Sequence, residues 1–486
     1  MSANNMAADI LTFPTPARMP FRLRTRGVGT LLTFLLACSL LMAQAGQAPA
    51  ATAGLTLEEA VSLALKNYPA ILVALEGVAA TRGGVDLART NYLPRTDFLW
   101  QNNRATRNNI FGLLLPQPVI SGISGPAGLN QAANVWGSAT GLMLAWEPFD
   151  FGLRQANVDI AESAVKRAEA GVGVTRLQVA ASAADAFLTL VATGQTLRAA
   201  TASVERARVF YEVVDARVKA GLRPGVDTAR ARAELALAEN LRIQAEQGAA
   251  VARVALAQLV GLPAGQVSVR EGPLLQLPPE EAAGADNLGA HPVAQEQNAA
   301  VEEIKARQRA LERSYFPRFN LLANTYARGT GALTNGRTLG GINGLGPNIA
   351  NWALGLNITF PVFELSSIRA RQRIELHRQL AEGARYDRVL QDLNGQLGRA
   401  RAILDGTRKA AQNTPFQLEA ARATEQQATA RYQAGLGTIL EVADSQRLLT
   451  QAEIDDSLAK LNVWRGLLLV GNARGDLEPF LLQARR

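Results

Sequence analysis

Two copies of the pattern Arg-x-x-Ala-Gly-Leu decide how this sequence is interpreted. They read Arg217-Val218-Lys219-Ala220-Gly221-Leu222 and Arg431-Tyr432-Gln433-Ala434-Gly435-Leu436. Each copy closes a long helical pattern, and another helical pattern begins soon after it, at Asp227 and at Thr438. Because glycine readily adopts the left-handed conformation that ends a helix, each copy is interpreted as a tight turn between antiparallel helices. The sequence therefore predicts a duplicated chain whose two halves each contain a helical hairpin.

Two further landmarks repeat at one offset of 223 residues. His291-Pro292 follows Tyr68-Pro69 at this interval, and Tyr315-Phe316-Pro317-Arg318 follows Tyr92-Leu93-Pro94-Arg95. A single offset that serves both landmarks indicates an internal repeat. The predicted organisation is a first repeat over 55–262, a linker over 263–290, a second repeat over 291–477 and a tail over 478–486.

The helical segments are unusually long. Thr56 with Glu59 predicts a capping box at the first helix. We expect long helices over 152–220 and 366–434, about 100 Å each at 1.5 Å per residue, and return helices over 227–261 and 438–471. Pro415 predicts a kink or a restart, with Thr414 as the cap.

After each Tyr-x-Pro-Arg the period changes from 3.6 to 2, which predicts strand pairs over about 95–147 and 318–360. From Asn351 to Phe360, apolar residues alternate with small or polar ones. Trp136 and Trp146 are ten residues apart, about 24 Å along the membrane normal at 45° tilt, close to the spacing of two aromatic girdles. A half-buried sheet in a soluble protein is the alternative. The predicted membrane girdle is Trp136, Trp146, Trp352 and Phe360.

The N-terminus has the pattern of a secretory signal peptide over residues 1–45. Arginines precede an apolar run from Val28 to Met42, and Ala43-Gln44-Ala45 offers a cleavage site. A start at Met19 would give a more ordinary length. The only cysteine, Cys38, is a candidate lipidation site within this segment, so the exported chain is expected to carry no disulfide.

Composition argues against nucleic-acid binding and catalysis. The net charge is +8, but the arginines alternate with acids along helices, as on solvated faces. The chain has two histidines, His291 and His377, no Gly-x-Ser-x-Gly sequence and no P-loop. We therefore expect no enzyme, no cofactor, no metal site and no nucleic-acid partner.

The order of these features resembles the TolC-like outer-membrane efflux protein family. The resemblance rests on Leu55-Thr56-Leu57-Glu58-Glu59-Ala60, Asn67-Tyr68-Pro69, both Tyr-x-Pro-Arg strand entries, and Arg431-Tyr432-Gln433-Ala434-Gly435 followed by Glu441 and Asp444. It implies a mainly α fold with a transmembrane β part. By this resemblance the long helices form a periplasmic α-barrel, and four strands join a trimeric 12-stranded β-barrel.

The resemblance also implies a periplasmic gate. Glu441 and Asp444 match the acidic pair that rings the aperture, although acids near a helix N-terminus also simply stabilise the helix dipole. Asp227 and Tyr432 match a pair that holds the tip closed. The family's third member, an arginine, falls at Gly437 here, and Arg431 or Arg223 is a candidate substitute. The implied adaptor-docking tips are Arg217, Ala220, Gly221, Leu222, Arg431, Ala434, Gly435 and Leu436.

The sequence thus predicts an outer-membrane channel, the exit duct of a tripartite efflux pump. Its expected partners are two further copies in a homotrimer, a periplasmic adaptor, an inner-membrane transporter and outer-membrane lipid. A type I protein secretion duct is one alternative, and a periplasmic coiled-coil scaffold or adaptor is another. The sequence names no substrate.

Overall fold

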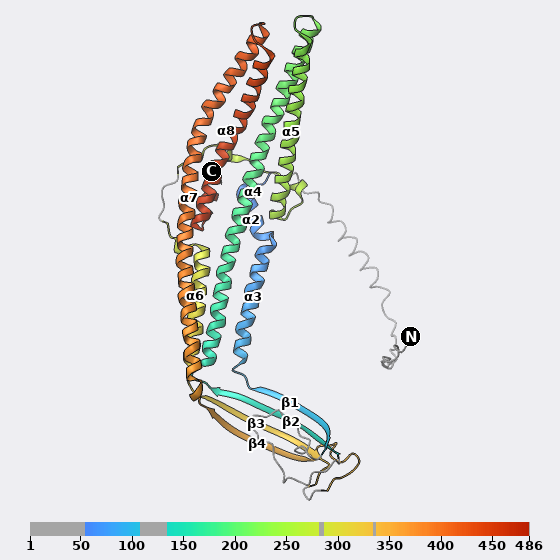
Figure 1. The fold of residues 1–486 in the computed structure, drawn as a ribbon, viewed down its shortest axis with the longest axis vertical. Coiled ribbons are helices and arrows are strands. Elements are labelled where there is room, and N and C mark those ends of the chain that lie inside the picture. Colours follow the sequence, from blue (N-terminus) through green and yellow to red (C-terminus); the bar gives the residue numbers. More distant parts are fainter. Residues whose placement is uncertain (1–53, 107–133, 281–285, 334–336, 486) are drawn as a thin grey trace, which may run out of the picture. The chain divides into compact units, whose positions relative to one another are not determined.

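The computed structural model describes residues 54–106, 134–280, 286–333 and 337–485. The predicted signal peptide, the alternative start at Met19 and the candidate lipidation site Cys38 lie outside these residues. Within residues 53–486, which form one compact unit, the four strands lie at one end of the helices and both hairpin tips lie at the other (Figure 1).

The same order of elements occurs twice. The first half contains α2 (Leu57–Asn67), α3 (Pro69–Thr90), β1 (Arg95–Thr106), β2 (Asn134–Phe149), α4 (Leu153–Lys219) and α5 (Gly225–Val260). The second contains α6 (Pro292–Arg313), β3 (Arg318–Thr330), β4 (Ile349–Thr359), η4 (Val362–Glu364), α7 (Leu365–Gln433) and α8 (Ile439–Arg474). Between them lie η1 (Ala264–Gln266), η2 (Gly272–Leu275) and η3 (Leu288–Ala290), and α9 (Glu478–Arg485) follows.

Local signals place several helix boundaries. The capping box predicted for α2 is confirmed: the backbone N–H of Glu59 donates to Thr56 Oγ1 at 3.2 Å, and the N–H of Thr56 donates to Glu59 Oε2 at 2.8 Å. Pro69 and Pro292 begin α3 and α6, where the missing N–H of proline leaves no hydrogen bond unmade.

Small residues let the long helices approach closely. The main core joins α2, α4, α5, α8 and α9 around the fully buried Phe187, Leu256 and Trp464. At Gly466 on α8, a β-carbon would lie 3.0 Å from the α-carbon of Leu404 on α7, so only glycine fits there without displacing a helix. One 18-residue window of α4 is apolar enough to cross a membrane, but half of it is buried against the other helices, as in a core helix.

At Pro415 the sequence predicted a kink or a restart. The restart is wrong, because α7 continues as one helix through this residue, and the kink stays a prediction. Thr414 is buried and is not a cap; its hydroxyl lies 3.1 Å from Asp456 Oδ1 on α8. The side chain of Asp456 also accepts a hydrogen bond from Lys460 at 2.8 Å. Packing against α8 therefore holds α7 helical across the proline.

The sheet is antiparallel with strand order β1-β2-β3-β4, so β1 and β4 are its unpaired edges. Paired residues point to the same face, and the register places Phe98, Leu142, Thr325 and Trp352 side by side. We call this the apolar face. Exposed large side chains cover it: Phe98, Trp100, Leu142, Trp146, Trp352, Leu354, Leu356 and Ile358.

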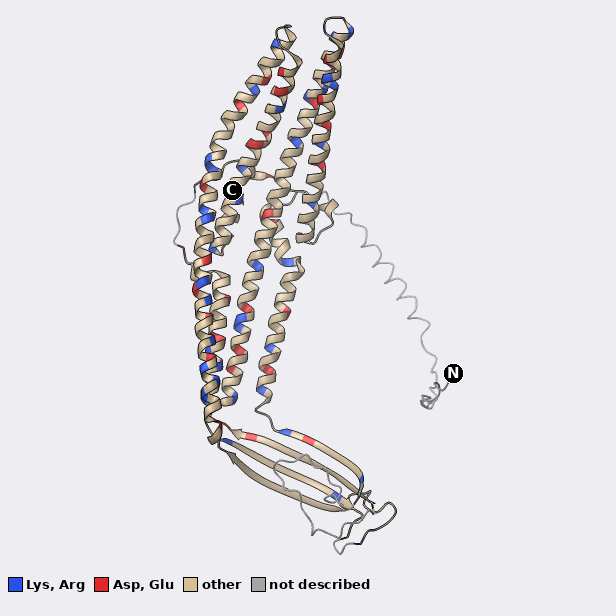
Figure 2. Cartoon of the chain, in the orientation of Figure 1, with Lys and Arg blue, Asp and Glu red and all other residues tan. Residues whose placement is uncertain are grey.

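The opposite, polar face carries small residues and carboxamides. It includes Gln101 and Asn103 on β1, Asn320 and Asn324 on β3, and Asn351 and Asn357 on β4. Figure 2 shows that the strands carry few charged residues compared with the helices. The alternation predicted for 351–360 and 136–146 is confirmed in β4 and β2, whose large apolar residues Leu142, Trp352 and Leu354 are exposed on the apolar face.

Three of the four predicted girdle residues, Trp136, Trp146 and Trp352, lie on the apolar face. Trp352 is 79% exposed. Phe360 is exposed one residue beyond the end of β4. The girdle role itself stays a prediction.

Candidate gate at the hairpin tips

The two tips are built alike. In the first, α4 ends at Lys219, Gly221 has φ +73°, and the N–H of Leu222 donates to Arg217 O at 2.9 Å. In the second, α7 ends at Gln433, Gly435 has φ +80°, and the N–H of Leu436 donates to Arg431 O at 2.9 Å. Both are Schellman turns, in which a left-handed glycine lets the next N–H satisfy a terminal carbonyl.

The apolar residues that follow the two glycines point into solvent. Leu222 is 72% exposed and Leu436 is 73% exposed. Ala220 and Ala434 cap their helices beside them. Arg217 already makes a contact within the protomer, because its Nη1 donates to Gln433 O of the other hairpin at 3.0 Å.

Tyr432 joins the two hairpins just below the tips. Its side chain is fully buried, and its hydroxyl donates to Asp227 Oδ2 on α5 at 3.3 Å. Its ring packs edge-on against Phe210 of α4, with centroids 5.3 Å apart, in a cluster with Val214 and Val442. Burial raises the pKa of the Tyr432 hydroxyl, and the neighbouring Asp227 carboxylate raises it further. The structure therefore brings Asp227 and Tyr432 together, as expected from the resemblance.

Of the two candidate substitutes for the family's arginine, Arg223, on the first tip, is the one that contacts Tyr432. Its guanidinium lies 4.7 Å from the centre of the Tyr432 ring, and its Nη2 donates to Tyr432 O at 3.1 Å. Arg431 stays within its own hairpin, where it reaches Leu436 O at 3.3 Å and Glu441 at 3.9 Å. At Gly437 a β-carbon would lie 3.1 Å from Tyr432 N, so a side chain there would push against the end of α7.

Glu441 and Asp444 lie apart from this buried contact. Both are on the first turns of α8, with side chains 48% and 60% exposed. The backbone N–H of Glu441 donates to the Thr438 hydroxyl at 3.3 Å, which begins α8. Asp444 is paired with Arg447 at 2.5 Å. Each exposed acid thus has a cation on its own hairpin, which reduces the negative charge it presents.

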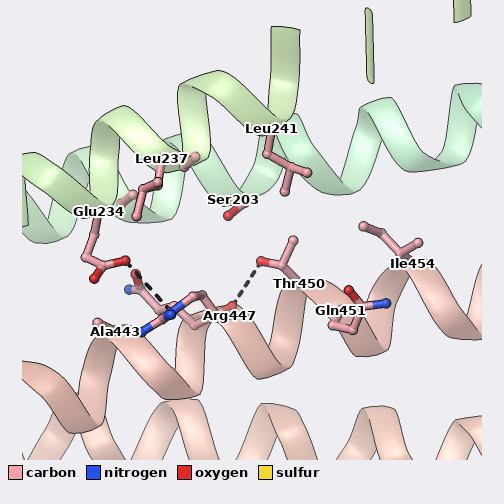
Figure 3. Close-up of a pocket in the computed structure, with 12 residues that line it drawn as sticks. Ser203, Glu234, Leu237, Leu241, Ala443, Arg447, Thr450, Gln451 and Ile454 are labelled. Atoms are coloured by element: carbon pink, nitrogen blue, oxygen red, sulfur yellow. Dashed lines mark hydrogen bonds and ion pairs between the residues drawn. The ribbon is translucent and has the colours of Figure 1, made fainter. Parts of the chain in front are cut away.

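A cleft separates the hairpins further from the tips (Figure 3). It encloses about 270 Å³, with Ser203 and Ala207 of α4 at its floor. Glu234 and Leu237 of α5 form one wall, and residues of α8 including Arg447 form the other. Beside it, α4 is tied directly to α8.

This tie is a bidentate ion pair between the helices. Arg206 Nη2 lies 3.0 Å from Glu453 Oε2 and 3.0 Å from the Thr450 hydroxyl, and Arg206 Nη1 lies 3.4 Å from Glu453 Oε1. The sequence analysis missed this pair, since no local pattern relates residues 247 positions apart.

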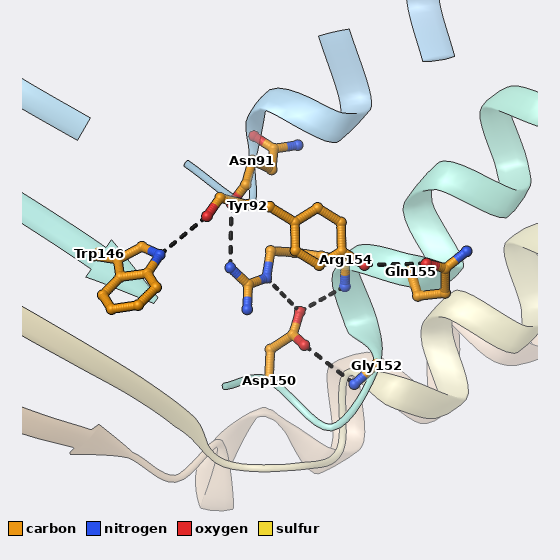
Figure 4. Close-up of polar contacts among 7 residues, drawn as sticks. All are labelled: Asn91, Tyr92, Trp146, Asp150, Gly152, Arg154 and Gln155. Carbon is orange, nitrogen blue, oxygen red and sulfur yellow. Dashed lines mark hydrogen bonds and ion pairs between the residues drawn. The ribbon is translucent and has the colours of Figure 1, made fainter. Parts of the chain in front are cut away.

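The junction between β2 and α4 was also missed (Figure 4). Asp150 and Arg154 form a buried ion pair at 3.0 Å, and Asp150 also accepts the backbone N–H groups of Gly152 and Arg154. Arg154 lies over the Tyr92 ring at 4.8 Å, and Trp146 Nε1 donates to Tyr92 O at 3.0 Å. The signal available in the sequence was Asp150 followed two residues later by Gly152, just after Pro148.

Among the described residues, no group of three His, Cys, Asp or Glu side chains is placed to hold a metal ion. His291 is the N-cap of α6: its Nδ1 accepts the N–H of Val293 at 3.2 Å, and its Nε2 lies 3.1 Å from Asn472 O. His377 is exposed on α7.

Comparison with known proteins agrees with this architecture. The family model described as outer membrane efflux protein matches residues 60–262 and 287–466. The chain is 25% identical over 356 residues to the pyoverdine export outer membrane protein OpmQ of Pseudomonas aeruginosa, covering 72% of each chain. It is 27% identical over 407 residues to protein CyaE of Bordetella pertussis, covering 81% of this chain and 78% of that protein. A crystal structure of CusC superposes with a TM-score of 0.70 at 18% identity, covering 88% of this chain and 93% of that one.

Proposed function

This chain belongs to the outer membrane efflux protein family, and we propose that three copies of it close into one duct whose hairpin tips form a periplasmic gate. The protein is an outer-membrane exit duct of an efflux or secretion system in a Gram-negative cell. Within that function, we favour export of small molecules by a tripartite pump. The similarity to a pyoverdine export protein supports this choice.

The observation that carries the proposal is the sheet with one exposed apolar face and two unpaired edges. Unpaired backbone groups at a strand edge cannot be satisfied by lipid, so a membrane sheet must close. With four antiparallel strands per copy, β4 of one protomer runs antiparallel to β1 of the next, and three copies supply twelve strands. A soluble scaffold, the alternative from another class, would have no use for this exposed face.

The tip contacts support a closed gate. Opening requires the two hairpins to separate, which breaks the Tyr432–Asp227 hydrogen bond and lifts Arg223 from the Tyr432 ring. It also breaks the bond from Arg217 to Gln433 O. We propose these contacts as the intramolecular part of the gate, with Glu441 and Asp444 facing the axis as a ring that binds cations.

The exposed tips support docking of a periplasmic adaptor. Leu222 and Leu436 project from rigid Schellman turns at the end of each hairpin, which is where a partner in the periplasm would first make contact. An adaptor in turn would connect the duct to an inner-membrane transporter that supplies the energy.

Planar-bilayer recording of the purified mature protein tests the duct and its ring together. We expect trimeric channels whose current is blocked by divalent cations added on the side of the tips. Changing Glu441 and Asp444 together to Ala should leave the trimer intact and remove the block. Asp455→Ala, which alters an acid further along α8, is the matched control and should keep it.

Absence of any channel from a correctly folded protein would reject the duct. If divalent cations still block the channels of the variant in which Glu441 and Asp444 are both Ala, only the assignment of the acidic ring is rejected. If a deletion strain loses secretion of a protein and keeps its small-molecule resistance, type I secretion would be favoured over efflux.

A further inference from the structure

Charge is unevenly distributed along the polar face of the sheet. Four charged residues, Arg95, Asp97, Glu147 and Arg318, lie in the half of the strands nearest the helices. Arg95 and Asp97 form an ion pair at 3.0 Å, and Glu147 lines the same cavity as Arg95. Acids and bases are therefore balanced at this end of the strands.

The far half of the polar face carries a single charged residue among those described, Arg328 on β3. The register places it opposite Ala139 of β2 and Ile349 of β4, so neither neighbour can neutralise it. No ion pair joins Arg328 to any described residue, and its Nε is buried without a hydrogen-bond partner. An arginine remains charged at every physiological pH.

Uncharged amide groups share the polar face with this cation. Asn103 and Asn324 lie on the same face, and the side-chain oxygen of each is buried without a hydrogen-bond partner in the described structure. Asn351 of β4 lies diagonally from Arg328, a separation of about 7–8 Å between α-carbons. Carboxamides carry no net charge and can solvate a polar solute of either charge. Arg328 therefore determines the sign of the local electrostatic potential.

We propose that Arg328 sets the charge preference of the membrane part of the duct and favours anionic organic solutes, those bearing carboxylate or phosphate groups, over cationic ones. The proposal rests on the trimeric closure described above, which brings three Arg328 side chains around one lumen. Low-dielectric walls focus such a field and raise the local concentration of oppositely charged solutes. Anions that have passed the tips would then meet a favourable potential on the way out.

Single cysteines can report this potential inside the lumen. Cys38, in the predicted signal peptide, is the only cysteine of the chain, so an added cysteine is an isolated target. We would introduce Asn351→Cys, treat intact cells from outside, and compare the labelling rates of an anionic and a cationic methanethiosulfonate of similar size. A local potential of one kT would favour the anionic reagent by about sevenfold in the rate ratio, after normalisation to a free thiol.

Two arginine variants make the test specific. Arg328→Gln in the Asn351→Cys background should bring the normalised ratio close to one. Arg104→Gln is the matched control, because Arg104 also lies in the far half of the strands but on the apolar face, where it contacts Trp136 at 5.4 Å and Asn134 at 2.8 Å. It should leave the ratio as in the parent. Raising the salt concentration should shrink the ratio, since screening shortens the range of the field.

The possible failures can be told apart. Labelling of Asn351→Cys with no anionic preference, or a preference that survives Arg328→Gln, would overturn the role of Arg328 and leave the duct standing. Leu354→Cys, on the apolar face, should be protected by lipid. If Leu354→Cys is labelled from water as fast as Asn351→Cys, the barrel itself is wrong and both proposals fall.

Discussion

The two halves of the molecule share one order of elements but differ in where they bury charge. At the junction of strand and helix, the first half buries the Asp150–Arg154 pair, whereas the second enters α7 through η4 with no side-chain cap hydrogen bond. At the tips, Asp227 of the first half is buried beneath Tyr432, whereas Glu441 of the second is exposed. The two halves thus share one backbone plan, but at these two positions only the first half buries a charged group.

This difference suggests a division of roles. Separating charges that are buried and paired costs free energy, so the Asp150–Arg154 pair holds α4 firmly to the end of β2. The acids at the second tip are exposed, so ions in the duct can compete with Arg431 and Arg447 for them. The following variants test this contrast, each paired with its counterpart in the other half or on the other surface.

The largest effect is expected at the first junction. Asp150→Ala leaves Arg154 buried without its partner and should lower the free energy of unfolding by about 3–5 kcal/mol. Glu364→Ala, at the entrance to α7, removes an exposed carboxylate that makes no cap hydrogen bond and should change it by less than about 0.5 kcal/mol. Urea unfolding of the detergent-solubilised protein measures both.

If Asp150→Ala does not fold, Asp150→Asn gives the comparison in milder form, because one oxygen still accepts a backbone N–H. Equal stabilities for the Asp150 and Glu364 variants would show that the two junctions do not differ in the way proposed.

A smaller effect is expected at the tips. Tyr432→Phe removes the donor to the buried Asp227 carboxylate and should cost about 1–3 kcal/mol, because that carboxylate stays buried. Glu441→Gln changes an exposed acid and should cost less than about 0.5 kcal/mol. In bilayers, Tyr432→Phe should also raise the fraction of time that channels are open. A tip that is no less stable, with unaltered opening, would argue against Tyr432 as a gate contact.

Sequence signals predicted the parts of this molecule that depend on near neighbours. The capping box at Thr56, the glycine tips and the alternation of β4 each involve residues within a few positions. The contacts of Arg223 with Tyr432 and of Arg206 with Glu453 join residues more than 200 positions apart, and many exposed arginines have the same local surroundings. The uninterrupted helix at Pro415 could not be predicted from local sequence for the same reason, because the residue that contacts Thr414, Asp456, is on another helix.

The smallest expected effect concerns pH and compares the two histidines. Burial lowers the pKa of His291, because a charged ring is poorly solvated there, and the contact of its Nε2 with Asn472 O opposes this shift only in part. A lowered pKa in the folded state means that this contribution to stability is complete above the unfolded pKa of about 6.5 and is lost as the pH falls through the folded pKa.

Between pH 7.5 and 5, the free energy of unfolding should therefore decrease, by at most about 1.4 kcal/mol per pH unit for this one proton. His291→Asn should flatten that dependence, whereas His377→Asn, at the exposed histidine, should not. Identical pH profiles for the wild type and His291→Asn would contradict the assignment.

The two unpaired edges of the sheet have a genetic consequence. A copy whose edge strand cannot pair with the neighbouring copies prevents closure of every trimeric barrel that it joins. In a cell making equal amounts of sound and defective copies, random assembly in threes would leave only about one ring in eight wholly sound. Mutations in β1 or β4 should therefore be dominant over a normal second copy, whereas a mutation that stops the chain from being made should be recessive.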